Sequence, residues 1–297
     1  MMVYPQKYSM FFLKLIGYLP LFVLYGIASI AKWLLYFVFS YRKKVIVQNI
    51  KNAFPALNSS EVNSLTLKFY AYLTDQMVEF FKGSTISKKE MLQRVNLVNE
   101  QVITDYLAKG IPVVLVAGHQ GNWEWAVHRL ALSDNLYDIV YQKLSSPLFN
   151  DFTFWVRSRF GSNVLMEKRE SVILARERQN IPRAICLAAD QSPSKPESAY
   201  WTHYLNQETG FFTGMERFAR EYKYPVIFVE LIRKKRGYYM MSFEELIKPS
   251  YEHIEKGVII ELFARRLEKS ILNYPDQYLW SHKRWKHEKP NQVTMNW

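Results

Sequence analysis

The chain has 297 residues, of which 49% are hydrophobic and 16% aromatic, and this composition excludes a disordered or fibrous protein. Its length allows one α/β domain with a sizeable core, and we favour this over two small domains. The 39 basic residues outnumber the 27 acidic ones, and the net charge of +12 indicates an anionic partner: nucleic acid, an acidic protein or phosphate-bearing lipid. The single cysteine, Cys186, excludes an intrachain disulfide and a cysteine-based zinc site.

The N-terminal region is the first strong pattern in chain order. Residues 11–39 are mostly apolar, and the basic cluster Arg42-Lys43-Lys44 follows them. This stretch is long enough for a tilted or bent membrane span, whereas Pro20 and the internal lysines suit an interfacial helix pair. In either case we expect residues 1–44 to be a membrane-associated segment. The positive-inside tendency then places the folded domain, residues 45–297, in the cytoplasm.

The rest of the chain alternates between helical and extended patterns. A helix is predicted over residues 60–82, with Ser60 as its N-cap and Gly83 as its end. Short apolar or β-branched runs predict strands at residues 112–117, 139–141, 184–187, 226–230 and 238–243. Helices are predicted between them, at residues 122–132, 147–159, 171–179, 213–222 and 254–273. This alternation predicts an α/β fold with a largely parallel sheet flanked by helices.

A polar run directly follows the first of these strands. It reads Gly118-His119-Gln120-Gly121-Asn122-Trp123-Glu124, and strand ends in α/β sheets are where ligands usually bind. Across a loop and a first helical turn, His119 and Glu124 can point at the same space. Glu124 would fix the imidazole tautomer, so that His119 deprotonates an alcohol or amine attacking a thioester. Alternatively, His119 is an ordinary polar loop residue and Glu124 is an acid that stabilises the first turn of a helix. The preceding strand and the two glycines favour a reaction centre.

Residues 116–124 resemble the His-x4-Asp/Glu motif of the lysophospholipid acyltransferase superfamily. The Gly-Asn-Trp-Glu ending resembles its lipid A late acyltransferase branch, the lauroyl and myristoyl transferases. Weaker resemblances to the same branch extend over nearly the whole chain, at residues 49–55, 140–141, 146–150, 157–161, 190–191 and 211–214.

The resemblance implies transfer of a fatty acyl chain from an acyl carrier protein or coenzyme A thioester to a hydroxyl of a membrane glycolipid, such as a lipid A precursor. It implies a catalytic domain on the cytoplasmic side of the inner membrane, with no metal, no cofactor and no covalent acyl-enzyme. His119 takes the role of base and Glu124 the orienting role. The chain departs from the family pattern directly after Tyr141. Many relatives have a basic residue at that position, whereas this chain has Gln142, followed by Lys143. The match over residues 213–220 is also loose.

Further substrate-binding side chains are expected where polar residues end helices, follow strands or open helices. They are Asn122, Lys143, Arg157, Arg159, Asp190, Thr213, Glu216 and Arg217. Arg157 and Arg159 suit a lipid or phosphopantetheine phosphate, or complement a helix dipole. Asp190 lies at a sheet edge or in a turn. Phe211 and Phe212 line an acyl channel or pack in the core.

The C-terminal run, residues 280–286, mixes cations with tryptophan. We favour a seat on the membrane surface over nucleic-acid binding, with His282 as part of this patch. Two other functions remain open. One is acylation of a different amphipathic lipid, an aminolipid or phosphoglycolipid. The other is a non-catalytic, membrane-tethered basic module.

Overall fold

A seven-stranded sheet forms the centre of the computed structural model, which describes residues 6–292 and the side chains from residue 10 onward. Its strands, in the order in which they lie side by side, are β1 (Val95–Val98), β9 (Tyr238–Ile247), β8 (Val226–Lys235), β2 (Val113–Ala117), β5 (Ala184–Ala188), β3 (Tyr137–Tyr141) and β4 (Val164–Glu167). Strands β8, β2, β5, β3 and β4 are parallel, β8 and β9 are antiparallel, and β1 is parallel to β9. The predicted mixed, largely parallel sheet is confirmed. A separate hairpin pairs β6 (Tyr200–Tyr204) with β7 (Gln207–Phe211).

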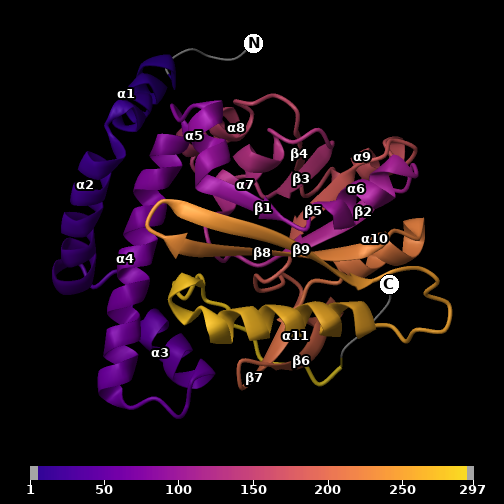
Figure 1. Cartoon of the computed structure of the whole chain (residues 1–297). Coiled ribbons are helices and arrows are strands. Elements are labelled where there is room, and N and C mark those ends of the chain that lie inside the picture. Colours follow the sequence, from indigo (N-terminus) through magenta and orange to yellow (C-terminus); the bar gives the residue numbers. More distant parts are fainter. Residues whose placement is uncertain (1–5, 293–297) are drawn as a thin grey trace.

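Helices cover both faces of the sheet. They are α1 (Gln6–Tyr18), α2 (Leu21–Trp33), α3 (Lys43–Ala53), α4 (Ser59–Gly83), α5 (Lys88–Arg94), α6 (Gln101–Ala108), α7 (Trp123–Leu130), α8 (Pro147–Arg157), α9 (Ser171–Glu177), α10 (Gly214–Tyr222) and α11 (Val258–Asn273). Figure 1 shows α1 and α2 lying along α4 at one side of the molecule. Short π and 3-10 turns occur at η1 (Leu34–Val38), η2 (Pro196–Ser198) and η3 (Pro275–Gln277).

The predicted strands and helices are present, with shifts at their ends. The long helix α4 begins at Ser59 rather than Ser60, because Asn58 is its N-cap and forms a reciprocal capping box with Glu61. Phe211 ends a strand, and α10 begins only at Gly214. The sequence patterns missed β1, β4, the β6–β7 hairpin, α3, α5 and α6. Strands β1 and β4 have only four residues each, too few for a period-two pattern to stand out.

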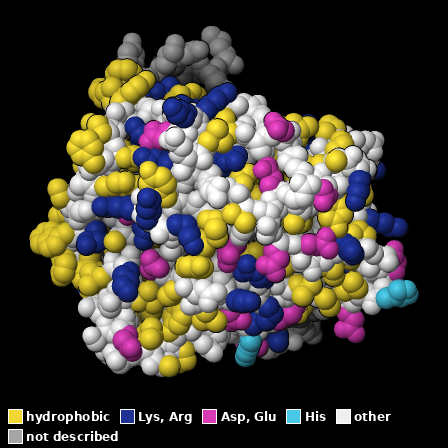
Figure 2. All heavy atoms as spheres, in the orientation of Figure 1, with side chains coloured by type: hydrophobic (Ala, Val, Ile, Leu, Met, Phe, Trp, Pro, Cys, Tyr) yellow, Lys and Arg dark blue, Asp and Glu magenta, His cyan; other side chains and the backbone are white. Residues whose placement is uncertain are grey.

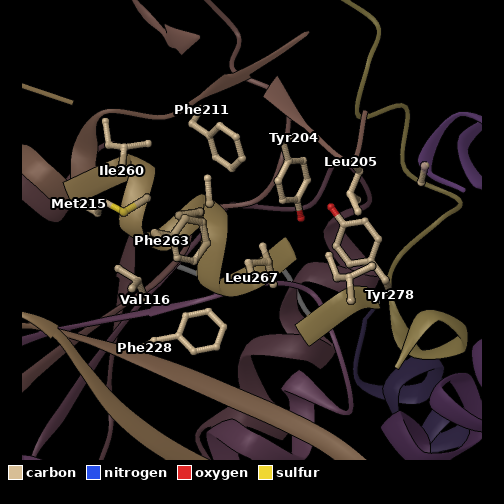
Figure 3. Packing of buried hydrophobic residues seen from close by; sticks show 14 of the residues in the cluster. Val116, Tyr204, Leu205, Phe211, Met215, Phe228, Ile260, Phe263, Leu267 and Tyr278 are labelled. Carbon is tan, nitrogen blue, oxygen red and sulfur yellow. The ribbon is translucent and has the colours of Figure 1, made fainter. Parts of the chain in front are cut away.

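The core lies in two layers, one on each face of the sheet. Along β2, Val114 and Val116 belong to the larger layer, whereas Val113 and Leu115 belong to the other. This alternation follows from the period of two in a strand, and burial on both faces explains why β2 is apolar throughout. In the larger layer, Phe263 of α11 packs between the sheet and the β6–β7 hairpin (Figure 3).

The apolar N-terminal segment is broken after α1 by Pro20, which precedes the first residue of α2. The continuous helical stretch Leu21–Val38 is long and apolar enough to cross a membrane, by length and composition alone. Leu24 and Ala28 pack with Val78 of α4. Large apolar side chains of the segment are nevertheless exposed: Phe11, Phe12, Leu15, Tyr18, Phe22, Ile27, Ile30, Trp33, Phe37, Val38 and Phe39. Figure 2 shows hydrophobic side chains along this edge with Lys and Arg nearby.

Substitution of Asp138 by alanine is expected to lower the free energy of unfolding by about 3–5 kcal/mol. Asp138 and Arg183 are fully buried and bonded to each other, and Arg178 adds two further hydrogen bonds of 3.0 Å to the carboxylate. Without Asp138 the Arg183 charge would stay buried without its partner. Equilibrium denaturation measures the loss. The exposed control Glu177→Ala should change the value by less than about 0.5 kcal/mol, and an equally small effect of Asp138→Ala would contradict the prediction.

Candidate active site

The loop between β2 and α7, residues 118–122, is packed too closely for side chains at its two glycines. Gly121 has a φ of +61°, and a Cβ there would lie 2.3 Å from the carbonyl oxygen of Leu231. A Cβ on Gly118 would lie 2.6 Å from a methyl carbon of Leu267 on α11. Both positions therefore need glycine for close approach, and Gly121 also for its left-handed backbone. The two contacts fix the course of the loop.

Helix α4 supports the same loop with a row of polar side chains. The Tyr72 hydroxyl donates to the Gly121 carbonyl oxygen at 2.6 Å, and the Gln76 amide donates to the same oxygen. One turn further, a Glu79 carboxylate oxygen accepts a hydrogen bond of 2.6 Å from Asn122 Nδ2. Tyr72, Gln76 and Glu79 are all buried, at spacings that put them on one face of α4. A row of polar residues on an otherwise apolar helix face could have predicted this support from the sequence. The sequence patterns considered above did not predict it.

Glu79 links two other elements, β9 and α2, to the loop. Its carboxylate also accepts hydrogen bonds from the Tyr239 hydroxyl of β9 at 2.6 Å and from the Tyr25 hydroxyl of α2 at 2.7 Å. Asn122, its third donor, also accepts from the backbone N–H of Trp125 and so caps α7. The Asn122 side chain, expected to bind substrate, is 1% exposed and holds the loop instead.

His119 forms an ion pair with Asp190. The distance from Nδ1 to Oδ1 is 2.6 Å, and the backbone N–H of His119 donates to Oδ2 at 2.9 Å. The two residues meet because β2 and β5 are parallel neighbours, with Ala117 opposite Ala188, and each residue lies two positions past its strand end. An ionised carboxylate only accepts hydrogen bonds, so Nδ1 carries the proton and Nε2 has the free lone pair.

The charges of this pair shift both pKa values. Burial lowers the pKa of His119, but the charge and hydrogen bond of Asp190 outweigh burial, so that the pKa is raised from its usual value. Burial likewise raises the pKa of Asp190, yet the His119 interactions outweigh it and the pKa is lowered. Asp190 therefore stays ionised and stabilises the imidazolium form of His119.

A polar side chain approaches the Nε2 atom of His119. The Gln191 amide nitrogen lies 3.3 Å from it, within reach of a weak hydrogen bond. The Trp123 ring packs edge-on against the imidazole, with centroids 5.2 Å apart. Asp190 thus fixes the orientation of the imidazole, and the Gln191 amide lies next to Nε2.

Glu124 bonds to Arg157 rather than to His119, which corrects the expected orienting contact. Arg157 Nε and Nη2 donate to the two carboxylate oxygens at 2.8 and 2.7 Å, and Trp123 Nε1 donates at 3.1 Å. Burial raises the pKa of Glu124, but Arg157 outweighs it and the pKa is lowered. The first turn of α7 directs Glu124 toward α8, so its remaining effect on His119 is electrostatic: its charge raises the pKa of His119.

Arg157 also lines a small hollow between β3, β4 and α8. Its other lining residues are Tyr141, Gln142, Leu144, Asn150, Thr153, Phe154 and Leu165. Lys143 is exposed and does not line this hollow. Arg159, the second arginine expected to bind an anion, donates instead to the carbonyl oxygens of Gly83 and Ile86.

The substrate-binding residues predicted near the start of α10 either hold the fold together or lie at the surface. Glu216 is fully buried and accepts hydrogen bonds from Arg220 Nε at 2.8 Å and from the Gly257 backbone N–H at 2.9 Å, so it anchors the start of α11. Arg217 is exposed, and Thr213 occupies the N-cap position of α10 without a capping side-chain bond. Phe211 is fully buried in the core, not in an acyl channel.

The C-terminal run folds inward, contrary to the expected seat on the membrane. Trp280 is fully buried and Arg284 is 3% exposed, whereas Lys283 and Lys286 are exposed. Asn49 of α3 donates to the Trp280 carbonyl oxygen at 2.8 Å, and His282 Nε2 accepts from the Ser192 backbone N–H at 3.2 Å. Burial lowers the pKa of His282 to about 4, so that ring is neutral.

The His119–Asp190 pair lies at the carboxyl edge of the parallel strands, where ligands of α/β folds usually bind. The family model described as "Bacterial lipid A biosynthesis acyltransferase" matches residues 3–287, and the chain belongs to this family. The protein is therefore an acyltransferase.

A solved structure similar to the chain is that of the 1-acyl-sn-glycerophosphate (LPA) acyltransferase, PlsC, from Thermotoga maritima. The two are 13% identical, with a TM-score of 0.36, and the match covers 92% of this chain and 99% of that one. No curated protein sequence matches the chain.

Substitution of Glu79 by glutamine is expected to remove a pH dependence of stability. Burial raises the pKa of Glu79 from 4.5 to about 6, and its hydrogen bonds to Tyr239, Tyr25 and Asn122 only partly oppose this. A carboxyl with a raised pKa stabilises the fold fully below about pH 4.5, and this contribution is lost as the pH rises through about 6. The shift corresponds to about 2 kcal/mol.

Urea unfolding measured between about pH 4 and 7 tests this prediction. The stability of the wild type minus that of Glu79→Gln should fall by about 2 kcal/mol as the pH rises over that window. The same difference for Glu177→Gln, an exposed control, should stay flat. A flat difference for Glu79→Gln would show that Glu79 does not titrate there.

Proposed function

We propose that the protein transfers a fatty acyl chain from an acyl carrier protein or coenzyme A thioester to a hydroxyl of a membrane glycolipid, with a lipid A precursor as the acceptor. One observation carries the mechanism: His119 bonds through Nδ1 to the ionised Asp190, which leaves Nε2 as a free base. Membership of the bacterial lipid A biosynthesis acyltransferase family supports the acceptor class.

In the proposed reaction, the acceptor hydroxyl displaces the Gln191 amide and binds at Nε2 of His119. Nε2 takes the hydroxyl proton as the oxygen attacks the thioester carbonyl carbon. Asp190 stabilises the imidazolium that forms. The carbon–sulfur bond then breaks, and the departing thiolate takes the proton back from Nε2. An ester and a free thiol leave, and His119 returns to its neutral form.

We assign Glu124 an indirect role, in place of the orienting role that the sequence suggested. It fixes Arg157 by two hydrogen bonds at the wall of the hollow between β3, β4 and α8. The pair also sets the local field, since Glu124 raises the pKa of His119 and Arg157 lowers it. Arg157 is the side chain of this hollow that suits a polar group of a substrate.

We further propose that residues 1–44 attach the catalytic domain, residues 45–297, to the cytoplasmic side of the inner membrane. The exposed apolar side chains of α1, α2 and η1, together with the helical stretch Leu21–Val38, support attachment. Tyr25 of this segment bonds to Glu79, which in turn holds Asn122, so the membrane-facing helices and the active-site loop share one network.

Replacing His119 by alanine or Asp190 by asparagine is expected to reduce acyl transfer roughly 10³- to 10⁴-fold, the loss typical when a base or its orienting acid is removed. Glu124→Gln should cost less, because Glu124 does not contact the imidazole. Transfer is measured with labelled acyl carrier protein or coenzyme A thioester and a tetra-acylated lipid A precursor. Asp105→Asn, an exposed control, should be fully active. Full activity of His119→Ala would refute the mechanism.

The pH dependence of kcat/KM tests whether Asp190 is the partner of His119. Only neutral His119 accepts a proton, so kcat/KM should rise with pH through a pKa above the usual histidine value. In residual Asp190→Asn activity the same rise should occur at lower pH, because the carboxylate that raises the pKa is gone. An unchanged profile would argue against Asp190 as the partner.

Exposed apolar side chains of the N-terminal segment are expected to drive membrane binding. Replacing Phe22, Ile30 and Phe37, which are 77%, 64% and 60% exposed, with serine should weaken partition to phosphatidylglycerol–phosphatidylethanolamine vesicles by roughly tenfold or more. A matched triple replacement of Leu92, Ile173 and Leu272, exposed elsewhere on the surface, should leave partition unchanged. If both triple variants partition equally, the exposed apolar side chains of the N-terminal segment are not the membrane-binding surface.

A further inference from the structure

Tyr25 of α2 belongs to the N-terminal segment, but its side chain faces the folded domain. The hydroxyl donates a hydrogen bond of 2.7 Å to Oε1 of Glu79, which is buried in α4. Burial and the charge of Glu79 raise the pKa of Tyr25, so its hydroxyl stays protonated and acts as a donor. The segment proposed above for membrane attachment therefore supplies a hydrogen bond to the interior of the catalytic domain.

The turn between β8 and β9 holds the Tyr25 side chain in place, and it lies next to α4 (Figure 1). The Arg236 guanidinium lies 4.4 Å from the centre of the Tyr25 ring, and its Nη2 donates to the Tyr25 carbonyl oxygen at 3.0 Å. Arg236 is itself anchored by Asp75 of α4, whose carboxylate accepts from Nε at 3.0 Å. A side-chain carbon at Gly237 would lie 2.3 Å from the Tyr25 hydroxyl oxygen. The hydroxyl is therefore confined between this turn and Glu79.

The two oxygens of the Glu79 carboxylate have different partners among the described residues. Oε1 accepts from Tyr25, whereas Oε2 accepts from Tyr239 and from Asn122 Nδ2. A carboxyl group is planar, and rotation about its terminal side-chain bond has only broad preferences of its own. The bond at Oε1 therefore helps to fix where Oε2 points. Without the Tyr25 hydroxyl, a buried oxygen would lack its partner, and the carboxylate would turn and move the oxygen that holds Asn122.

Asn122 connects this carboxylate to the active-site loop. It is the last residue of that loop and the N-cap of α7. Its Nδ2 donates to Glu79 at 2.6 Å, and its Oδ1 accepts from the Trp125 backbone N–H at 2.9 Å. A shift of Glu79 Oε2 would therefore move both the end of the loop and the first turn of α7, where the Trp123 ring packs against the His119 imidazole. A displacement of about 1 Å at a reacting group can cost roughly 100-fold in rate.

We propose that Tyr25 is a positioning residue for acyl transfer: its hydroxyl orients Glu79, and Glu79 in turn holds Asn122 and the loop that carries His119. The effect on turnover rests on the proposed function, whereas the hydrogen-bonded connection does not. The N-terminal segment then contributes to the rate of the reaction in addition to membrane attachment, because α2 supplies the donor for Oε1 of Glu79.

Tyr36 offers a matched control within the same segment. Its hydroxyl also donates to a side chain of α4, in this case the exposed Asn63. Asn63 lies about 24 Å before Glu79 along the helix axis, at a rise of about 1.5 Å per residue. Tyr25→Phe and Tyr36→Phe therefore each remove one hydroxyl contact between the segment and α4, but only Tyr25 contacts the residue that holds Asn122.

Steady-state kinetics of the detergent-solubilised full chain compare these variants. Tyr25→Phe should lower kcat about tenfold and change the KM of either substrate by less than about twofold, whereas Tyr36→Phe should keep the wild-type kcat. Because Tyr25 acts through Glu79, the double variant Tyr25→Phe/Glu79→Gln should have a kcat no lower than that of the more impaired single variant. Equal kcat values of Tyr25→Phe and Tyr36→Phe, or losses that multiply in the double variant, would overturn the proposal.

Hydrogen exchange of the same variants measures the connection without the reaction. The backbone N–H groups of His119 and Trp125 are hydrogen-bonded, so exchange in peptides that cover residues 118–126 reports how firmly the loop is held. Exchange there should be several-fold faster in Tyr25→Phe and unchanged in Tyr36→Phe. Unchanged exchange in Tyr25→Phe would overturn the proposed connection. If the exchange results are as expected but the wild type transfers no acyl chain, the proposed function is refuted and the connection through Tyr25 stands.

Discussion

The pairing of β2 with β5 is the constraint on which the rest of the site depends. It places Ala117 opposite Ala188 and therefore brings His119 and Asp190, 71 residues apart, within 2.6 Å of each other. The bidentate contact, to the ring and to the backbone N–H of His119, holds one tautomer and one orientation. The close-packed glycines at 118 and 121 then leave the loop a single course, so that Nε2 faces Gln191.

Buried polar groups of α4 hold that loop from behind. Tyr72 and Gln76 bond to the Gly121 carbonyl oxygen and Glu79 bonds to Asn122, so this row satisfies loop groups that burial would otherwise leave unpaired. Such a network is strong only when every member is paired, because an unpaired polar group in the interior is costly. Through Tyr25 the same network reaches the exposed apolar helices, so the N-terminal segment is connected by hydrogen bonds to the loop that carries His119.

Much of the charge in this basic chain is arranged in specific pairs. Glu124 with Arg157 and Asp138 with Arg183 are buried or nearly buried pairs in which the guanidinium edge meets a carboxylate. Arg284 departs from that arrangement, since two of its buried nitrogens have no hydrogen-bond partner among the described residues.

The sequence by itself determined strands β2, β3, β5, β8 and β9, the α/β class, the apolar N-terminal segment and the position of His119 just past a strand, because these depend on local periodicity and on turn residues. It could not determine which acid meets His119. Spacing along the chain favoured Glu124, but the first turn of α7 turns that side chain to Arg157, while strand order brings Asp190 alongside. Only the tertiary structure decided this, since contacts between distant strand ends depend on which strands pair. For the same reason it alone showed that Trp280 and Arg284 fold inward, where aromatic and cationic residues had suggested a membrane surface.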